Sequence, residues 1–405
     1  MSRRKPGLPL ATSQRWLPAA GLVGVAAVLA AFTASRTGAP AGRTLPGAAG
    51  LHPAPQVAPF YLGADVSFLD SPRPGRPLPT YQEHGQASDE LTILERHGWN
   101  AYRLRVFVSP VRQAPDNSLE NTIPLARRIK ASGALFLLDI HYSDTWADPQ
   151  HQEIPVAWRG LSFDSLEKTV EAYSFHTIKA LKDAGAMPDW VHVGNEITRG
   201  TLWPVGQVEE PGDTAYLPPQ PYDSTLQWAH LTGLLKAGIR GVMAAAGNTP
   251  PRIAIHIDRG GDWPRTKWFF DHLEAAHVPY DIIAESFYPE WRHGTLEQLW
   301  QNMDSCAARF HKDFLVAETG YGASHGPGDN PDMMWPLTPA GRLQFMVDLV
   351  NTVKQAPRGL GVMYWAPEFG VWNPDGSPGP AVFTLDSLTA LTARPASHAP
   401  AEVHP

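Results

Sequence analysis

The chain has 405 residues, 43% of them hydrophobic, which is more than one small domain needs and enough to build a sizeable core. Its net charge of −7 is uneven, because residues 1–50 hold six basic and no acidic side chains. The rest carries 27 basic and 40 acidic residues, a net charge of −13, which argues against a nucleic acid as substrate. The only cysteine, Cys306, excludes an intrachain disulfide.

Residues 1–34 have the pattern of an export segment. A basic stretch is followed by 19 almost wholly apolar residues, Trp16–Ala34. That run is long for a cleaved signal peptide and close to a membrane span, and a cleavage site near Thr33–Ser35 is weak, so signal peptide and signal anchor both stay open. The preceding positive charge keeps the N-terminus in the cytoplasm in both cases. We therefore expect an extracellular or periplasmic protein, either secreted or anchored to the membrane.

Pro-, Ala- and Gly-rich residues 35–59 predict a linker, and residues 392–405 predict a disordered tail. Between them, residues 60–391 predict a single domain in which short apolar runs alternate with segments of helical period. The predicted strands are Phe60–Val66, Tyr102–Val108, Ala134–Ile140, Trp190–Gly194, Arg252–Ile257, Asp281–Phe287, Phe314–Ala317 and Leu360–Trp365.

The helix candidates between these strands carry start and stop signals. Three capping boxes begin at Asp164, Ser224 and Thr295, and Thr338-Pro339 is a further start. Gly98, Gly133 and Gly185 fall where helices should end, and a last helix is expected within Ala381–Leu391. Strands alternating with helices predict an α/β fold with a parallel sheet, and eight of them predict a closed (β/α)8 TIM barrel. An open doubly wound sheet is the alternative, but no Gly-x-Gly-x-x-Gly follows any strand.

Polar or aromatic side chains stand at the C-terminal end of every predicted strand. In a barrel these ends meet at one mouth, where active sites lie. We expect nine of these residues to bind substrate: Asp65, Arg103, His141, Asp144, Trp146, Asn195, His256, Tyr288 and Trp365. Further aromatic residues that could stack on sugar rings are Trp158, Trp203, Trp291 and Trp372, and a cleft lined in this way suits endo-action on a polymer.

Two carboxyl groups, Glu196 and Glu318, close the fourth and seventh strands and lie across the mouth from each other. Cleavage of a glycosidic bond needs one protonated carboxyl group and one carboxylate, about 5–5.5 Å apart for retention of configuration. One of the two could instead form a structural ion pair with Arg103 or Arg105. Both interpretations can hold, because an arginine can keep a nucleophilic carboxylate ionised.

Three histidines, His141, His192 and His256, raise the alternative of a zinc site. None of the 16 histidines forms His-x-His or His-Glu-x-x-His, so no metal site is predicted. We expect His141 and His256 to hydrogen-bond substrate or a carboxylate, and His192 to point into the barrel.

Several motifs together resemble glycoside hydrolase family 53, the arabinogalactan endo-β-1,4-galactanases. The most specific is Asp139–Pro149 (DIHYSDTWADP), with Pro155–Trp158 after it. The others are Gly63–Ser67, Arg103–Val106, Val193–Ile197, Leu202–Pro204, Ser286–Pro289, Glu318–Tyr321 and Tyr364-Trp365. The resemblance implies a (β/α)8 barrel that hydrolyses β-1,4-galactan with retention.

By the same resemblance, Glu196 matches the acid/base and Glu318 the nucleophile. Asn195 matches the residue that binds the 2-hydroxyl group, and Trp365 matches the floor of that subsite. A structural calcium ion in a late loop is known in some bacterial members, but the acidic residues here are too scattered to place one, and no other cofactor is expected. The implied partner is a polysaccharide, and a monomer is expected.

The chain departs from the family pattern at three places. It reads Tyr364-Trp365-Ala366-Pro367 where family members tend to read Tyr-Trp-Glu-Pro, and Glu368, two positions later, is the candidate to replace the lost carboxylate. Strand six has Glu285 where an apolar or small residue is usual and Phe287 where Tyr is usual, and the loop 205–221 is unfamiliar. A β-glycanase with another polymer preference, or a carbohydrate-binding barrel without catalysis, therefore stay open as alternatives.

Overall fold

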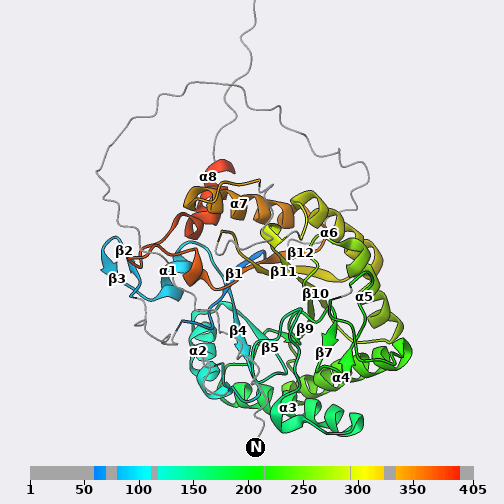
Figure 1. Ribbon diagram of the computed structural model, residues 1–405. Coiled ribbons are helices and arrows are strands. Elements are labelled where there is room, and N and C mark those ends of the chain that lie inside the picture. The colour runs from blue at the N-terminus through cyan, green and yellow to red at the C-terminus, as the bar shows by residue number, and fades with distance from the viewer. Residues whose placement is uncertain are drawn as a thin grey trace, which may run out of the picture. The chain divides into compact units, whose positions relative to one another are not determined.

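Eight parallel strands form a closed barrel surrounded by helices (Figure 1). This computed structural model describes residues 59–69, 80–110, 117–213, 215–291, 293–322 and 334–392. The predicted export segment and nearly all of the predicted linker and tail lie outside these residues. The barrel strands are β1 (Tyr61–Asp65), β4 (Ala101–Val106), β5 (Leu135–Ile140), β6 (Trp190–Val193), β9 (Arg252–Ile257), β10 (Ile282–Phe287), β11 (Asp313–Thr319) and β12 (Gly359–Tyr364).

Around the barrel the strands follow the order β1-β12-β11-β10-β9-β6-β5-β4. The prediction of a (β/α)8 barrel is confirmed, and each predicted strand ends within two residues of the observed one. Two short hairpins pair β2 (Gln82–Glu83) with β3 (Gln86–Ala87), and β7 (Gly200–Thr201) with β8 (Gly206–Gln207).

The helices are α1 (Glu90–Arg96), α2 (Leu119–Ser132), α3 (Phe163–Asp183), α4 (Ser224–Ala246), α5 (Trp263–Ala275), α6 (Leu296–Phe310), α7 (Pro339–Gln355) and α8 (Thr384–Thr392). Short 3-10 turns lie at Val156–Trp158, Pro289–Trp291, Pro367–Phe369 and Pro380–Phe383. Thr295 and Gln298 form the predicted capping box of α6, and Thr338 caps α7 ahead of Pro339.

The other two capping predictions are wrong in position. Ser162 caps α3 by accepting from the amide of Ser165, and Asp223 caps α4 by accepting from Leu226. A suitable side-chain oxygen one or two residues upstream extends each helix backwards, so that Asp164 and Ser224 fall inside the first turn.

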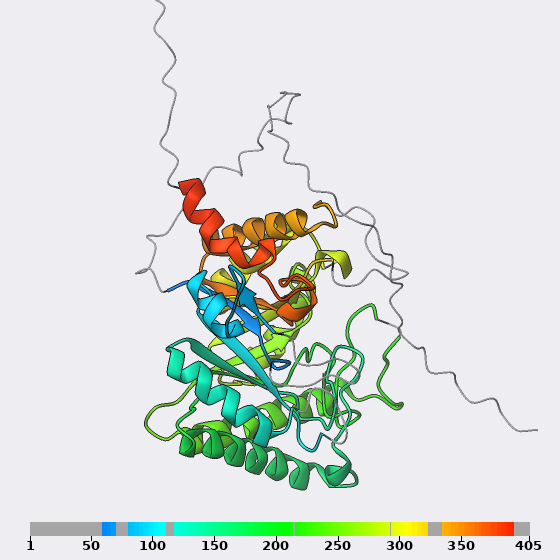
Figure 2. The same ribbon diagram turned by 90° about the vertical axis from the view of Figure 1, so that its left-hand side faces the viewer.

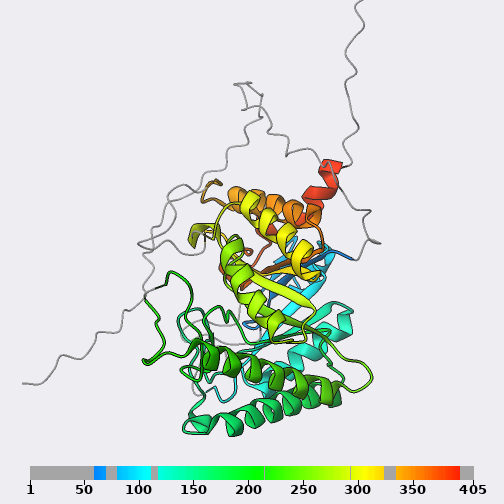
Figure 3. The same cartoon turned by 90° about the vertical axis from the view of Figure 1, so that its right-hand side faces the viewer.

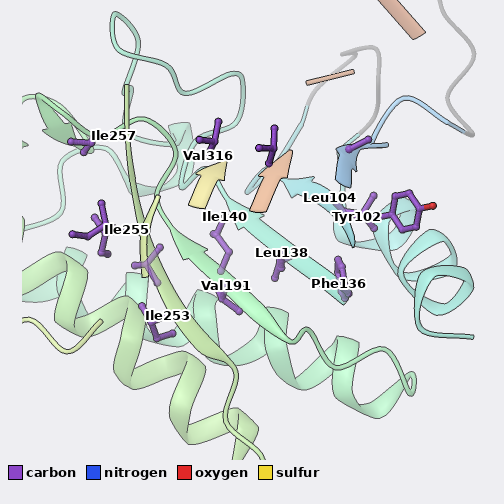
Figure 4. Packing of buried hydrophobic residues seen from close by; sticks show 14 of the residues in the cluster. Tyr102, Leu104, Phe136, Leu138, Ile140, Val191, Ile253, Ile255, Ile257 and Val316 are labelled. Atoms are coloured by element: carbon purple, nitrogen blue, oxygen red, sulfur yellow. The ribbon is translucent and has the colours of Figure 1, made fainter. Parts of the chain in front are cut away.

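Alternation along the strands divides the side chains between two environments. Phe136, Leu138 and Ile140 of β5 belong to the layer between strands and helices, as do Val191 and the isoleucines of β9 (Figure 4). The intervening positions point into the barrel. At its N-terminal end they form an apolar floor of Ala101, Leu135, Leu137, Trp190, Ala254, Ile282, Ala284, Leu315, Ala317, Leu360 and Met363. Towards the C-terminal ends the inward positions are charged or polar, and this is where the site forms.

Helices α3 and α4 run side by side along one flank of the barrel (Figures 2 and 3). Their close approach depends on Gly241 in α4. A Cβ atom at this position would lie 2.2 Å from the backbone carbonyl oxygen of Glu171 in α3. At Gly233, in the same helix, the nearest atom would instead be Cζ of the Phe163 side chain, at 2.9 Å.

We predict that alanine destabilises the protein at Gly241 but has a smaller effect at Gly233. Alanine favours a helix by about 1 kcal/mol over glycine, but overpacking against backbone costs about 1–3 kcal/mol. Gly241→Ala should therefore lower the thermal unfolding midpoint by a few degrees. Gly233→Ala, the matched control, should change the midpoint less, because the Phe163 side chain can move aside. Equal midpoints for the two variants would contradict this account of the α3–α4 contact.

Candidate active site

A cleft of about 720 Å³ opens among the C-terminal ends of the barrel strands, and both Glu196 and Glu318 line it. The walls come from the ends of β4, β5, β6, β9, β10, β11 and β12 and from the loops that follow them. The cleft therefore lies where a (β/α)8 barrel gathers side chains from strands far apart in the sequence.

Glu318 is held by two hydrogen-bond donors. Its Oε2 accepts from Nη2 of Arg103 at 2.6 Å, and its Oε1 accepts from the hydroxyl of Tyr288 at 2.8 Å. Nε of Arg103 donates in turn to Asp65 at 2.7 Å. Burial opposes the charge of Arg103, but the carboxylates of Glu318, Asp65 and Asp139 outweigh it and raise the pKa of Arg103 well above its usual value. These contacts hold Glu318 as a charged, oriented carboxylate.

A β-bulge turns Glu318 towards the cleft. Along β11, Leu315 and Ala317 both belong to the barrel floor, so strict alternation would point residue 318 outward. The pairing of β10 with β11 shifts here: Glu285 pairs with Val316, but Ser286 pairs with Glu318. The extra residue on β11 shifts the alternation of inward and outward side chains, so the carboxyl group of Glu318 points into the barrel.

Glu196 has a different environment. Its backbone is left-handed, with φ of 48°, in the tight turn after β6. Its Oε1 lies 2.6 Å from the hydroxyl oxygen of Ser286. Burial and the negative charges of Glu318 and Asp258 raise the pKa of Glu196 well above its usual value. The surroundings of Glu196 favour its protonated form, and the contacts of Glu318 with Arg103 and Tyr288 suit a carboxylate, which is the division of roles that acid and nucleophile require.

The structure separates the nine residues expected to bind substrate into two groups. The six that line the cleft are Arg103, His141, Trp146, Asn195, Tyr288 and Trp365. Asp65, Asp144 and His256 do not line it. Asp65 pairs with Arg103, Asp144 accepts from the backbone amide of Val156, and His256 lies fully buried beside Asn195.

Three of the four additional aromatic residues expected from the sequence do not line the cleft. Trp158 packs against Tyr173, the indole of Trp203 donates to the carbonyl of Arg199, and the indole of Trp372 donates to Glu90. The side chain of Trp291 lies outside the described part of the chain.

His141 and His192 lie around the buried carboxylate of Asp139. His141 accepts from the backbone amide of Ala147 through Nδ1, so its proton is on Nε2, 3.2 Å from Asp139. His192 faces the other oxygen of Asp139 at 3.5 Å. Burial works against the charge of Asp139, but His141, His192 and Arg103 hold its pKa well below the usual value. Among the described residues, no group of three or more His, Cys, Asp or Glu side chains is placed to hold a metal ion.

Two of the departures noted in the sequence lie away from the cleft. Glu285 points outward from β10 and accepts hydrogen bonds from Thr266 of α5 and Asn302 of α6. Glu368 does not line the cleft, and its negative charge helps to raise the pKa of the buried carboxyl group of Glu90, after burial itself. Glu368 therefore does not put a carboxylate back into the cleft in place of the residue that Ala366 lacks.

The third departure does reach the cleft. After the hairpin of β7 and β8, the loop brings Tyr216 to the wall, where it lies against Arg199, with the guanidinium carbon 5.1 Å from the ring centroid. Arg199 is fixed by ion pairs with Glu210 and Asp213. Neither lining residue was predicted from the sequence, because neither stands at the end of a strand.

Arg105 is a further lining residue that was not predicted to bind substrate. Its side chain is buried, yet none of its guanidinium nitrogens has a hydrogen-bond partner in the described structure. Its nearest carboxylate, Asp65, is 3.6 Å away, and its guanidinium carbon lies 4.4 Å from the ring centroid of Trp146. Buried donors without partners are costly, so they fit a ligand that supplies hydroxyl oxygens. The signal in the sequence was the Arg103-x-Arg105 alternation, which puts both arginines on one face of β4.

A closed (β/α)8 barrel with two carboxyl groups in contrasting surroundings in an open cleft is the arrangement found in barrel glycoside hydrolases. The sequence model described as glycosyl hydrolase family 53 matches residues 61–384. The chain belongs to this family and is a glycoside hydrolase.

Relatives and solved structures agree with this assignment. An uncharacterized protein of Niallia circulans is 38% identical over 78% of this chain and 84% of its own length. An arabinogalactan endo-β-1,4-galactanase of Thermothelomyces thermophilus is 33% identical over 70% of this chain and 82% of its own.

Among solved structures, a fungal β-1,4-galactanase superposes with a TM-score of 0.70 at 28% identity, covering 81% of this chain and 99% of its own. The family 53 catalytic domain of Ignisphaera aggregans gives a TM-score of 0.68 at 28% identity, covering 82% and 98%. A family 10 enzyme of Paenibacillus barcinonensis, at 14% identity and a TM-score of 0.53, shares the fold.

We predict that Arg105 contributes to ligand binding and not to folding. Arg105→Met keeps the apolar stem and removes the donors. Affinity for an oligosaccharide of the substrate glycan, measured by calorimetry, should fall about tenfold or more. The thermal midpoint should stay within about 2 °C of wild type, because no intramolecular hydrogen bond is lost. Arg240→Met, on the outer surface of α4, is the control. Unchanged affinity in the Arg105 variant would refute the assignment.

Proposed function

We propose that this protein is a retaining endo-β-1,4-galactanase that cleaves β-1,4-galactosidic bonds in galactan and type I arabinogalactan. Membership of family 53 and relatives named arabinogalactan endo-β-1,4-galactanases support this activity. The observation that carries the mechanism is the contrast between Glu318, bonded to Arg103 and Tyr288, and Glu196, whose pKa is raised.

In the first step the carboxylate of Glu318 attacks the anomeric carbon, while Glu196 gives its proton to the glycosidic oxygen as the bond breaks. The result is a glycosyl ester on Glu318 and a shortened chain as leaving group. In the second step Glu196, now ionised, takes a proton from water, which attacks the same carbon and releases Glu318. Both roles are filled by carboxyl groups, so the proposed reaction needs no metal ion or cofactor.

Substrate binding is assigned to the residues of the cleft walls. Trp146 and Trp365 offer flat apolar faces to sugar rings, and Asn195 and Arg105 offer hydrogen-bond donors. The cleft opens onto the barrel mouth and is lined along its length by polar side chains, which suits cleavage within a polymer.

We further propose that the enzyme acts outside the cytoplasm as a monomer and does not bind nucleic acid. The basic and apolar segment 1–34 supports export, and the net charge of −13 after residue 50 disfavours a polyanion. Among the helices of the described residues, none combines the length and apolarity of a membrane span.

The polymer is tested with a panel of β-1,4-linked galactan, mannan, xylan and glucan, with release of reducing sugar as the readout. We expect release from galactan alone. Glu318→Gln should lower the rate at least about 10³-fold, because the nucleophile is lost. Glu120→Gln, on the surface of α2, is the control and should keep full activity.

The other outcomes of this panel separate the alternatives. Release from another polymer would keep the mechanism and change the substrate. No release from any polymer, with tight binding to one, would show a carbohydrate-binding barrel without catalysis. Full activity of Glu318→Gln would overturn the assignment of the nucleophile.

Retention of configuration is a separate prediction. Two displacements at one carbon restore its configuration, so the β-anomer should appear first when cleavage is followed by proton NMR. The carboxyl groups should be about 5–5.5 Å apart in a crystal structure. If the α-anomer formed first, water would attack directly and Glu318 would be a general base.

A further inference from the structure

Three buried side chains, Ser286, His256 and Asn195, connect Glu196 to a backbone carbonyl through continuous hydrogen bonds. Ser286 Oγ lies 2.6 Å from Glu196 Oε1 and 2.9 Å from His256 Nε2. His256 Nδ1 lies 2.8 Å from Asn195 Oδ1, and Asn195 Nδ2 donates to the carbonyl oxygen of Ala147 at 2.8 Å. Ser286 and His256 are fully buried, away from bulk solvent.

The carbonyl of Ala147 sets the direction of every hydrogen bond in this line. A carbonyl oxygen only accepts, so the amide nitrogen of Asn195 must face it; the flipped amide would place two oxygens 2.8 Å apart. The Asn195 oxygen then faces His256 and also only accepts. The proton of a neutral His256 must therefore be on Nδ1, and Nε2 is left as an acceptor.

The tautomer of His256 in turn fixes which group donates in the hydrogen bond between Ser286 and Glu196. Nε2 of His256 accepts the single proton of the Ser286 hydroxyl, so the oxygen of Ser286 is free only to accept. With the Ser286 proton directed to His256, the donor across the 2.6 Å contact between Ser286 Oγ and Glu196 Oε1 is a protonated Glu196. Ser286 donates to this oxygen, and so lowers the pKa of Glu196, only when its proton is turned away from His256. A doubly protonated His256 would break this order, but burial, together with His192 and Arg103, lowers the pKa of His256 well below its usual value.

We propose that Asn195, His256 and Ser286 form a one-way hydrogen-bond chain that keeps Glu196 protonated until it donates to the leaving group. This inference rests on the proposed function, since it assumes that Glu196 is the acid. His256 and Ser286 are positioning residues. When Glu196 has given its proton away, Ser286 turns to donate to the carboxylate, and the bond between Ser286 and His256 is lost. These residues therefore make one more hydrogen bond when Glu196 is protonated than when it is ionised.

Other groups also act on Glu196, and the test must hold them constant. They are Asp148 after β5, Asp258 after β9, Tyr288 after β10 and Glu318 on β11, all lining the same cleft. Comparing single variants at His256 and His192 leaves all four in place. His192 is a matched control, because it is equally buried, its ring lies 4.9 Å from His256, and it makes no contact with Ser286 in the described structure.

The first experiment is kinetic. In His256→Phe, Ser286 has no hydrogen bond to residue 256 to give up when it donates to ionised Glu196. The alkaline limb of kcat/KM on galactan should therefore move about 0.5–1 unit to lower pH. Cleavage of an aryl glycoside with a strongly acidic leaving group should keep its rate, because it needs no proton from Glu196. His192→Phe should move the alkaline limb much less than His256→Phe does, because His192 makes no hydrogen bond to Ser286 among the described residues. An unmoved limb in His256→Phe, or an equal shift in both variants, would overturn the proposal.

The second experiment needs no variant and so does not depend on whether His256→Phe folds. Neutron diffraction from the wild-type protein, at the pH of highest activity, should show deuterium on His256 Nδ1, on Ser286 directed to Nε2, and on Glu196 Oε1. Deuterium on Nε2, with Ser286 directed to Glu196, would refute the chain. Either result is distinct from failure of the proposed function, which would appear as absence of cleavage by the wild type.

Discussion

The buried guanidinium of Arg103 is the interaction on which the site depends. It binds Asp65 and Glu318 at once, from the middle of a barrel whose floor is wholly apolar. Charges removed from water are stable only when they are paired and hydrogen-bonded, so the three side chains must be placed together. Since they come from β4, β1 and β11, the closed barrel itself is required for Glu318 to be ionised and correctly oriented.

The two candidate catalytic carboxyl groups differ through their partners. Glu318 receives hydrogen bonds from a cation and a phenol, whereas Glu196 meets a serine hydroxyl in a buried line that ends at a backbone carbonyl. The negative charge of Glu318 also raises the pKa of Glu196, after burial. The division of labour is thus a property of the pair and its surroundings.

The features that distinguish this chain from the family pattern fall into two kinds. Glu285 and Glu368 lie outside the cleft, among helices and loops, where they affect packing and charge but do not meet the substrate. The loop after β8 brings Tyr216 and Arg199 into the wall. Of these features, the loop is therefore the one that adds side chains to the cleft wall.

The sequence by itself determined the eight strands, the barrel and the position of the site, because hydrophobic periodicity and polar strand ends are local properties of the chain. It also pointed to Glu196 and Glu318, each placed at a strand end. It could not place Asp144 and His256 outside the cleft or Arg105 within it, since those outcomes depend on contacts between distant segments. Only the tertiary structure decided that Glu318 points inward, because that follows from a bulge in the pairing of β10 with β11. Only it decided the direction of the hydrogen bonds around Glu196, because that direction is set by a backbone carbonyl in another loop.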